Sequence, residues 1–98
     1  HIWTANFNGG TVSKIVASTG VVAATIDVGN SPIGVAFDGT HIWTANHSDG
    51  TVSKIVASTG VVAATIGVGG LPWGVAFDGT HMWVANGDDD TVSKIAVG

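Results

Sequence analysis

Short apolar runs rich in Val, Ile, Ala and Trp alternate along the chain with polar breaks that contain Gly, Asp and Ser. Glycine and proline recur too often for a helix of ordinary length, and β-branched residues dominate between the breaks. The pattern therefore predicts strands, and the best-framed stretch holds four of them, at 33–37, 41–46, 51–57 and 61–68. Asp-Gly and Ser-Thr-Gly between the runs are typical of short hairpin turns, so we expect antiparallel pairing.

The same pattern returns every 40 residues. Residues 1–40 and 41–80 differ at only seven positions, and a third, partial copy occupies residues 81–98. A fixed period of this length indicates one supersecondary unit copied in tandem. Four antiparallel strands in 40 residues match the size of one β-propeller blade. We therefore expect an all-β propeller built from four-stranded antiparallel blades.

Two features of the repeat indicate how the strands pack. The run Gly34-Val35-Ala36-Phe37, unchanged at 74–77, is small and apolar on both faces, as expected for an innermost strand between neighbouring blades. A tryptophan recurs in the next strand of each copy, and aromatic rings carry the largest apolar area per residue. We expect these tryptophans to pack blade against blade rather than to stack on a ligand; they are Trp3, Trp43 and Trp83.

The repeat reads PxGVAFDGTxIWxANxxxxTVSKIxxSTGxVxATIxVG, where x marks variable positions. This string resembles the YVTN-type and NHL-like β-propeller repeats, and it is also similar to the repeats of virginiamycin B lyase-like proteins. The resemblance covers the whole chain and implies blades whose strands A to D run from the inside outward. On this basis 1–32 hold strands B, C and D of a first blade, 33–72 form one complete blade, and 73–98 hold strands A, B and C of a last blade.

About two and a half blades are too few to close a ring of the usual four to eight. An open stack exposes two large apolar faces, which favours association. The first blade lacks an inner strand and the last lacks an outer one, so each end can complete the other across a chain boundary. We therefore expect a homo-oligomer in which two or three chains close one ring. The alternative is a fragment of a longer protein or an engineered truncation.

The differences between the two full copies fall in or beside two kinds of connection, the B–C loop and the D–A connection. In a propeller both emerge on the same face of the disc. Divergence confined to one face is typical of a binding surface, and the alternative is drift in loops that carry no packing. Aromatic, amide, hydroxyl and carboxylate groups together suit a neutral polar ligand such as a sugar. The candidate ligand-binding residues are Phe7, Asn8, Asn30, Ser31, His47, Ser48, Asp49, Leu71 and Trp73.

Trp73 is the strongest of these candidates, because its counterpart Ile33 shows that packing at this position needs no tryptophan. The alternative is that Trp73, next to Pro72, is simply a packing residue.

Composition limits the other partners. A net charge of −4 with three lysines and no arginine argues against a nucleic-acid partner. No apolar run approaches 18 residues, so we expect no membrane span. The absence of cysteine excludes disulfides and thiolate metal sites, and it leaves the cellular compartment open. With one lysine in each repeat, we expect these residues to occupy a solvated structural position.

Metal sites and cofactors are not expected. Asp88 and Asp90 lie in an acidic loop that loosely resembles a calcium loop, but the closing glutamate is missing, so a solvated hairpin is favoured. A histidine starts strand B in each copy, at His1, His41 and His81. Imidazole rings can bind zinc or copper. We favour instead a structural hydrogen bond between each histidine and the Asp-Gly-Thr turn before it.

Catalysis finds little support in the sequence. There is no cysteine and no serine in a Gly-x-Ser-x-Gly turn. His47 and Asp49 share one loop, but their spacing is not specific for a base and its orienting group. The resemblance to virginiamycin B lyase implies a magnesium-assisted elimination that uses His and Glu, and this chain contains no Glu. We expect a non-enzymatic repeat scaffold, with a lectin-like binder of a carbohydrate or small molecule as the first alternative and a lyase-like enzyme as the second.

Overall fold

The computed structural model describes residues 1–97, which form strands and turns without a helix. The all-β class and the repeated antiparallel sheets are therefore confirmed. No segment of residues 1–97 is a helix with the length and apolar character of a membrane span. The strands are β1 (Ile2–Asn6), β2 (Thr11–Ile15), β3 (Val22–Asp27), β4 (Pro32–Phe37), β5 (His41–Asn46), β6 (Thr51–Val56), β7 (Val62–Gly67), β8 (Pro72–Phe77), β9 (His81–Asn86) and β10 (Thr91–Ala96).

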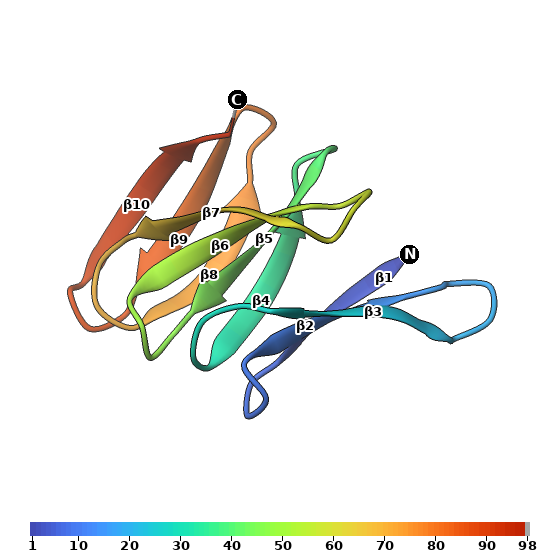
Figure 1. Cartoon of the computed structure of the whole chain (residues 1–98). Helices are drawn as coiled ribbons and strands as arrows, with labels where there is room; N and C mark the ends of the chain where they lie inside the picture. Colours follow the sequence, from blue (N-terminus) through green and yellow to red (C-terminus); the bar gives the residue numbers. More distant parts are fainter. Residues whose placement is uncertain (98) are drawn as a thin grey trace.

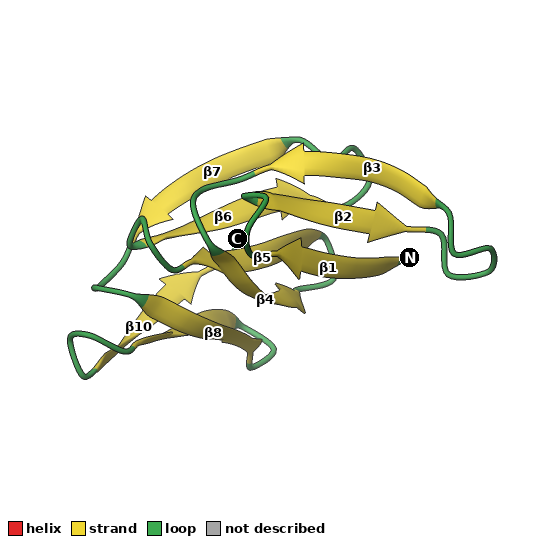
Figure 2. Cartoon of the chain, turned by 90° about the horizontal axis from the view of Figure 1, so that it is seen from below, coloured by secondary structure: helices red, strands yellow, loops and turns green. Residues whose placement is uncertain are grey.

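Within residues 1–97 the strands make three sheets, which we call the first sheet (β1-β2-β3), the central sheet (β4-β5-β6-β7) and the last sheet (β8-β9-β10). Figure 1 shows them in chain order, with the first sheet in blue at one end and the last sheet in orange and red at the other. The inner strand β4 contacts both β8 and β1. Figure 2 shows the outer strands β3 and β7 along one border of the molecule.

The inner strand β4 contains a bulge at Gly34, where its register against β5 shifts between Ile33 and Val35. Gly34 has a φ of 68°, a left-handed conformation that glycine adopts without a steric penalty. Its carbonyl accepts a hydrogen bond of 2.7 Å from Thr44 Oγ1. A Cβ at this position would lie 3.7 Å from the Trp73 carbonyl, so the bulge brings the backbones of β4 and β8 close together.

Two apolar clusters hold the sheets together. The first cluster lies between the first and central sheets, and the second cluster lies between the central and last sheets. Trp43 is the largest fully buried side chain and belongs to the second cluster, so the expected packing role is confirmed for this tryptophan. The buried members are Val12, Ile26, Ile42 and Ile55 in the first cluster, and Trp43, Val52, Met82 and Val84 in the second.

Each lysine lies over the tryptophan of its own sheet. The Lys14 and Lys54 ammonium nitrogens are 5.5 and 5.3 Å from the ring centroids of Trp3 and Trp43. Each also donates a hydrogen bond of 2.9 Å to a backbone carbonyl in the next repeat: Lys14 to Ala57, and Lys54 to Val97. The structural role expected of these positions is thus confirmed for Lys14 and Lys54, which join one repeat to the next and are only partly exposed to solvent.

Phe37 differs from the expectation for an innermost strand. We expected the Gly-Val-Ala-Phe run to be buried on both faces, but Phe37 is 55% exposed. Its counterpart Phe77 packs against the second cluster. The difference has a simple cause. Strand β8, which carries Phe77, contacts the inner strand β4 of the preceding sheet, whereas the described part of the first sheet has no strand in the equivalent place beside Phe37.

The burial of Trp43 predicts its contribution to stability. Trp43→Ala should lower the free energy of unfolding by about 3–5 kcal/mol, because it leaves a cavity in the second cluster. The control is Trp73→Ala, at a tryptophan that is 53% exposed, which should cost only about 1–2 kcal/mol. Urea unfolding at equal chain concentration measures both. Equal losses in the two variants would contradict the assigned packing.

Candidate functional site

The variable loops meet at one end of the strands, as the sequence predicts. The connection between β3 and β4 contacts the β5–β6 loop through its backbone and its side chains. His47 N donates to the Ser31 carbonyl at 3.0 Å, and Ser48 Oγ donates to Ser31 Oγ at 2.8 Å. Three of the candidate ligand-binding residues thus bond to one another.

Asp49 fastens the same two loops. The backbone and side-chain amides of Asn30 donate to the two oxygens of its carboxylate, at 2.9 and 2.8 Å. These hydrogen bonds favour the charged form and hold the pKa of Asp49 below its ordinary value. In the last sheet Asp89 plays the same part, because its carboxylate accepts from Gly70 N at 2.9 Å. The carboxylates of this face therefore join one sheet to the next.

Trp73 and the residues around it are matched in size. The Trp73 ring meets His47 edge-on, with centroids 4.8 Å apart and planes at 69°. Position 87 is the third-copy equivalent of His47, and a Cβ on Gly87 would come within 2.6 Å of Trp73. A side chain at 87 would therefore force the Trp73 ring to shift, whereas the central sheet combines the smaller Ile33 with a histidine at 47. Part of the divergence between copies is compensation in packing.

Phe7, Asn8 and Leu71 complete the predicted set. Phe7 and Leu71 are exposed, at 50% and 40%. Asn8 is also exposed, in the loop of the first sheet. The structure thus gathers Asn30, Ser31, His47, Ser48 and Asp49 in one bonded cluster, with Trp73 against His47. Among the described residues, no hydrogen bond joins Phe7 or Asn8 to that cluster.

The acidic loop of the last sheet is a turn. Asp90 has a φ of 55°, the left-handed conformation that Gly10 and Gly50 adopt at the equivalent positions. Asp88 N donates to the Gly70 carbonyl at 3.1 Å, which anchors the loop to the preceding connection. Over residues 1–97, no group of three His, Cys, Asp or Glu side chains lies in an arrangement that could hold a metal ion.

The Asp-Gly-Thr turns at the other end of the strands form a hydrogen-bonded motif. The Asp38 carboxylate accepts from Trp43 Nε1 at 2.8 Å and from the His41 amide at 2.7 Å. Asp78 and Trp83 repeat the first bond at 2.7 Å. The expected bond between each histidine and the preceding turn is confirmed for His41 and His81, through their backbone amides. The five-residue spacing in DGTHIW and DGTHMW is the sequence signal that predicts this motif.

These bonds also set the pKa values of the two turn aspartates. Burial opposes ionisation of Asp38, but the hydrogen bonds from Trp43 and from the backbone amides outweigh it and hold the pKa of this carboxyl below its ordinary value. The Trp83 indole N–H, followed by the His81 and Thr80 amides, holds the pKa of Asp78 well below its usual range. Both carboxylates are thus charged whenever the turn is intact at neutral pH.

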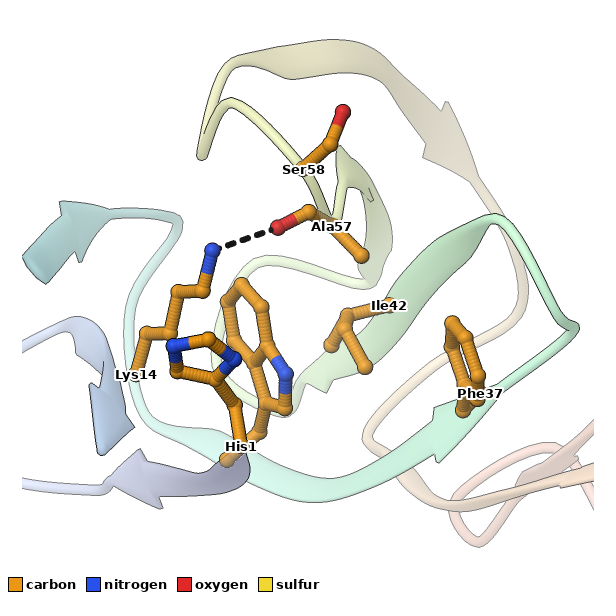
Figure 3. Close-up of a pocket in the computed structure, with 7 residues that line it drawn as sticks. His1, Lys14, Phe37, Ile42, Ala57 and Ser58 are labelled. Carbon is orange, nitrogen blue, oxygen red and sulfur yellow. Dashed lines mark hydrogen bonds between the residues drawn. The ribbon is translucent and has the colours of Figure 1, made fainter. Parts of the chain in front are cut away.

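A cavity that sequence reasoning missed lies beside β1. It has a volume of about 510 Å³, and a second cavity of about 220 Å³ shares several of its lining residues. In Figure 3 the Lys14 side chain reaches the Ala57 carbonyl at the border of the larger cavity. None of the nine candidate loop residues lines either cavity. The larger cavity is lined by His1, Trp3, Lys14, Phe37, Ile42, Ala57 and Ser58.

No protein-family model and no curated protein matches this chain. Among solved structures it is similar to the hydrazine synthase of Kuenenia stuttgartiensis, with 24% identity and a TM-score of 0.90 over 98% of this chain. It is also similar to the computationally designed Ika4 protein (19% identity, TM-score 0.80, 93% of this chain) and to the WD40 β-propeller domain of Doa1 (18%, 0.81, 93%). These similarities show a propeller-like fold.

The chain spans only part of each of those structures, namely 29% of the hydrazine synthase chain, 57% of Ika4 and 31% of the Doa1 chain. The matched part is therefore less than two thirds of each of those chains. At this level of identity the similarity carries the fold and no activity.

The lowered pKa values of Asp38 and Asp78 predict a pH dependence of stability. A carboxyl whose pKa is lower in the folded state than the unfolded value of about 3.9 stabilises the fold fully above that value. That stabilisation is lost as pH falls through the folded pKa, so unfolding by urea should become easier as pH is lowered below about 4. Asp78→Asn should weaken this dependence, because it removes the titrating group at the Trp83 indole.

The control for this measurement is Asp27→Asn, at an exposed residue of β3. This change leaves the hydrogen bond between Asp78 and the Trp83 indole in place, so the loss of stability that depends on that bond should remain. The two variants are compared by their urea midpoints at pH 7 and pH 3. An Asp78→Asn chain with the full parental pH dependence would contradict the assigned role of the turn.

Proposed function

We propose that this protein is a non-enzymatic β-propeller repeat scaffold whose copies associate end to end into a closed ring. The observation that carries this proposal is a match between the two ends of the stack. Each end face exposes the same side chains that the central sheet buries against its neighbours.

The outer face of the last sheet is one half of this match. Val92 is 61% exposed and Trp83 is 37% exposed. Their counterparts on the central sheet, Val52 and Trp43, are fully buried where that sheet meets the last one. The outer face of the last sheet thus carries the same residues as the face of the central sheet that packs against the last sheet.

The outer face of the first sheet is the other half. Ile2 and Val22 are both more than half exposed. Their counterparts Ile42 and Val62 belong to the first cluster or pack against it, and so contact the preceding sheet. Because the residues on each side are the same, the last sheet of one copy can meet the first sheet of another through contacts that the chain already forms internally.

The lysine bond extends across the same junction. Lys94 lies over Trp83 at 5.5 Å, as Lys14 and Lys54 lie over theirs. The acceptor equivalent to Ala57 on the first sheet is the Ala17 carbonyl. In the assembly we expect Lys94 Nζ to donate to the partner's Ala17 carbonyl, which fixes the direction of the contact.

The number of sheets favours two copies. Two copies supply six sheets, which lies within the usual range of four to eight for a closed propeller. Three copies supply nine. A head-to-tail contact that closes on itself leaves no apolar end face in water, whereas an open stack keeps two.

Native mass of the purified chain tests this proposal. The parent chain should have twice the chain mass, and Val92→Glu should be a monomer, because the change buries an unpaired charge in the contact. The control is Val61→Glu. Val61 is 59% exposed although its sheet is flanked on both sides, so it should stay in water in the ring and leave the mass unchanged.

Light scattering behind size exclusion measures the three masses, and urea unfolding confirms that each chain is folded. A parent chain that is a folded monomer at all concentrations would overturn the proposal. So would a Val92→Glu chain that keeps the parental mass.

A second candidate function is favoured by the exposed aromatic residues of the loop face. Trp73 is half exposed beside the exposed Leu71, and an exposed ring near hydroxyl and amide groups suits stacking on a neutral sugar. If this face is a binding site, Trp73→Ala should abolish the glycan-array signal and keep the native mass. Phe7→Ala removes a ring of similar exposure from the loop of the first sheet. If both variants lose binding, the two loops form one site; if only Trp73→Ala loses binding, the site lies at Trp73 alone.

A further inference from the structure

Five pairs in this chain join an asparagine or an aspartate to a following glycine. In such a pair the glycine amide nitrogen can attack the side-chain carbonyl carbon of the preceding residue, because glycine has no side chain to obstruct the approach. The structure holds the first side chain in place in four of the pairs and leaves it free in one. The pairs begin at Asn8, Asp38, Asp49, Asp78 and Asn86.

The three aspartates are held by hydrogen bonds as charged acceptors. Asp38 and Asp78 each accept from the indole N–H of the tryptophan five residues later. Asp49 accepts from the backbone and side-chain amides of Asn30. An aspartate is also a carboxylate at neutral pH, and a nucleophile attacks a carboxylate poorly. These three pairs are therefore protected by chemistry as well as by contacts.

Asn86 is a neutral amide, but it is buried and bonded. It is 2% exposed, and its amide nitrogen lies 3.2 Å from Thr91 Oγ1 and 2.9 Å from Ser93 Oγ, to which it donates. The nitrogen that would attack it, Gly87 N, donates to the Leu71 carbonyl at 3.0 Å. Both partners of the reaction are thus fixed in other bonds.

Asn8 has none of these restraints. It is exposed in the β1–β2 loop, and among the described residues no hydrogen bond holds its side chain. Gly9 N donates to the Asn6 carbonyl at 3.2 Å, and the same carbonyl accepts from Gly10 N at 3.1 Å. Release of Gly9 N therefore leaves no unpaired carbonyl, so it costs little.

The exposure of Asn8 is a property of the loop. Its counterparts Ser48 and Asp88 are also exposed, although the sheets that carry them each follow another sheet. The bond of the following residue is also the same in the central sheet, where Asp49 N donates to the Asn46 carbonyl at 3.2 Å. The free amide therefore does not depend on the open side of the first sheet.

We infer that Asn8 is a site of spontaneous covalent modification, at which water converts the side-chain amide to a carboxylate. Gly9 N bonds to Asn8 Cγ and gives up its proton, while the bond between Cγ and the amide nitrogen breaks. Ammonia leaves with that proton, and a cyclic succinimide remains. Water then opens the ring at one of its two carbonyl carbons, which gives either aspartate or isoaspartate.

The two products differ in their effect on the loop. Aspartate is the residue that the third copy carries at the same position, as Asp88, so this product fits the turn. Isoaspartate lengthens the backbone by a methylene group, which should break the bonds of Gly9 N and Gly10 N to Asn6. Either product adds a negative charge to the loop face. The inference does not rest on the proposed ring or on a ligand at this face.

Peptide mapping of the aged chain tests the site. The folded chain is kept in mildly alkaline buffer, and fragment masses then locate any exchange of NH₂ for OH. The exchange should appear at Asn8 and not at Asn86. In a sample kept in urea both should react, because unfolding frees the second amide and its glycine.

Two variants separate the chemistry from the fold. Asn8→Ser carries the residue of the second copy and should lose the modification completely. Gly9→Ala keeps the asparagine and should react several-fold more slowly, because a Cβ hinders the attacking nitrogen. The nearest atom to that Cβ would be Thr11 Oγ1, at 3.4 Å, so alanine fits the loop. Urea unfolding establishes that both variants are folded.

Asn8→Asp tests the assigned products. This variant should unfold at the parental urea midpoint, since it reproduces the product that fits the turn. In the aged parent chain, the fraction that contains isoaspartate should unfold at a lower urea concentration. Ion exchange separates the charged products from the unreacted chain before the measurement.

Three results would overturn the inference. The first is an Asn8 that stays unchanged in the folded chain, whether or not it reacts in urea. The second is equal conversion of Asn8 and Asn86 in the folded chain. The third is a folded Gly9→Ala chain that reacts as fast as the parent.

Discussion

Contact between the apolar faces of successive sheets is the interaction on which this structure depends. A sheet of three or four short strands buries little by itself and needs a second layer against it. Trp43 is the largest fully buried side chain at the junction between the central and last sheets. The Lys54 side chain lies over its ring, and the Lys54 ammonium group donates to the Val97 carbonyl of the last repeat. The junction thus combines apolar burial with a lysine hydrogen bond that joins the two sheets.

Loop chemistry follows from the same stacking. Asp49 and Asp89 join the connection before a sheet to the hairpin loop within it, so these carboxylates act between elements that the stacking has already brought together. The pairing of Trp73 with Gly87 shows that a change in one loop is matched in the other. Variation on this face is therefore constrained by packing, and any ligand site there must use the exposed remainder of the rings.

The fold class could be predicted from the sequence because turn signals and period are local. The strands of the central sheet begin and end within one residue of the expected positions. The lysine bonds were not predicted, since they join residues 43 apart on different sheets. Burial of Phe37 was predicted wrongly, because exposure depends on the neighbouring strand and not on the residue itself. The cavity beside β1 was missed for the same reason.

The identity of β1 and β5 has a consequence for how the chain folds. Strand β4 pairs with β5 and not with β1, although residues 1–6 and 41–46 carry the same six side chains, so side-chain chemistry does not distinguish the two possible partners. Chain connectivity distinguishes them. Three residues separate β4 from β5, whereas 25 separate it from the end of β1, and closing the longer loop costs roughly 2 kcal/mol more in entropy. Correct pairing in this repeat is therefore decided by the length of a turn.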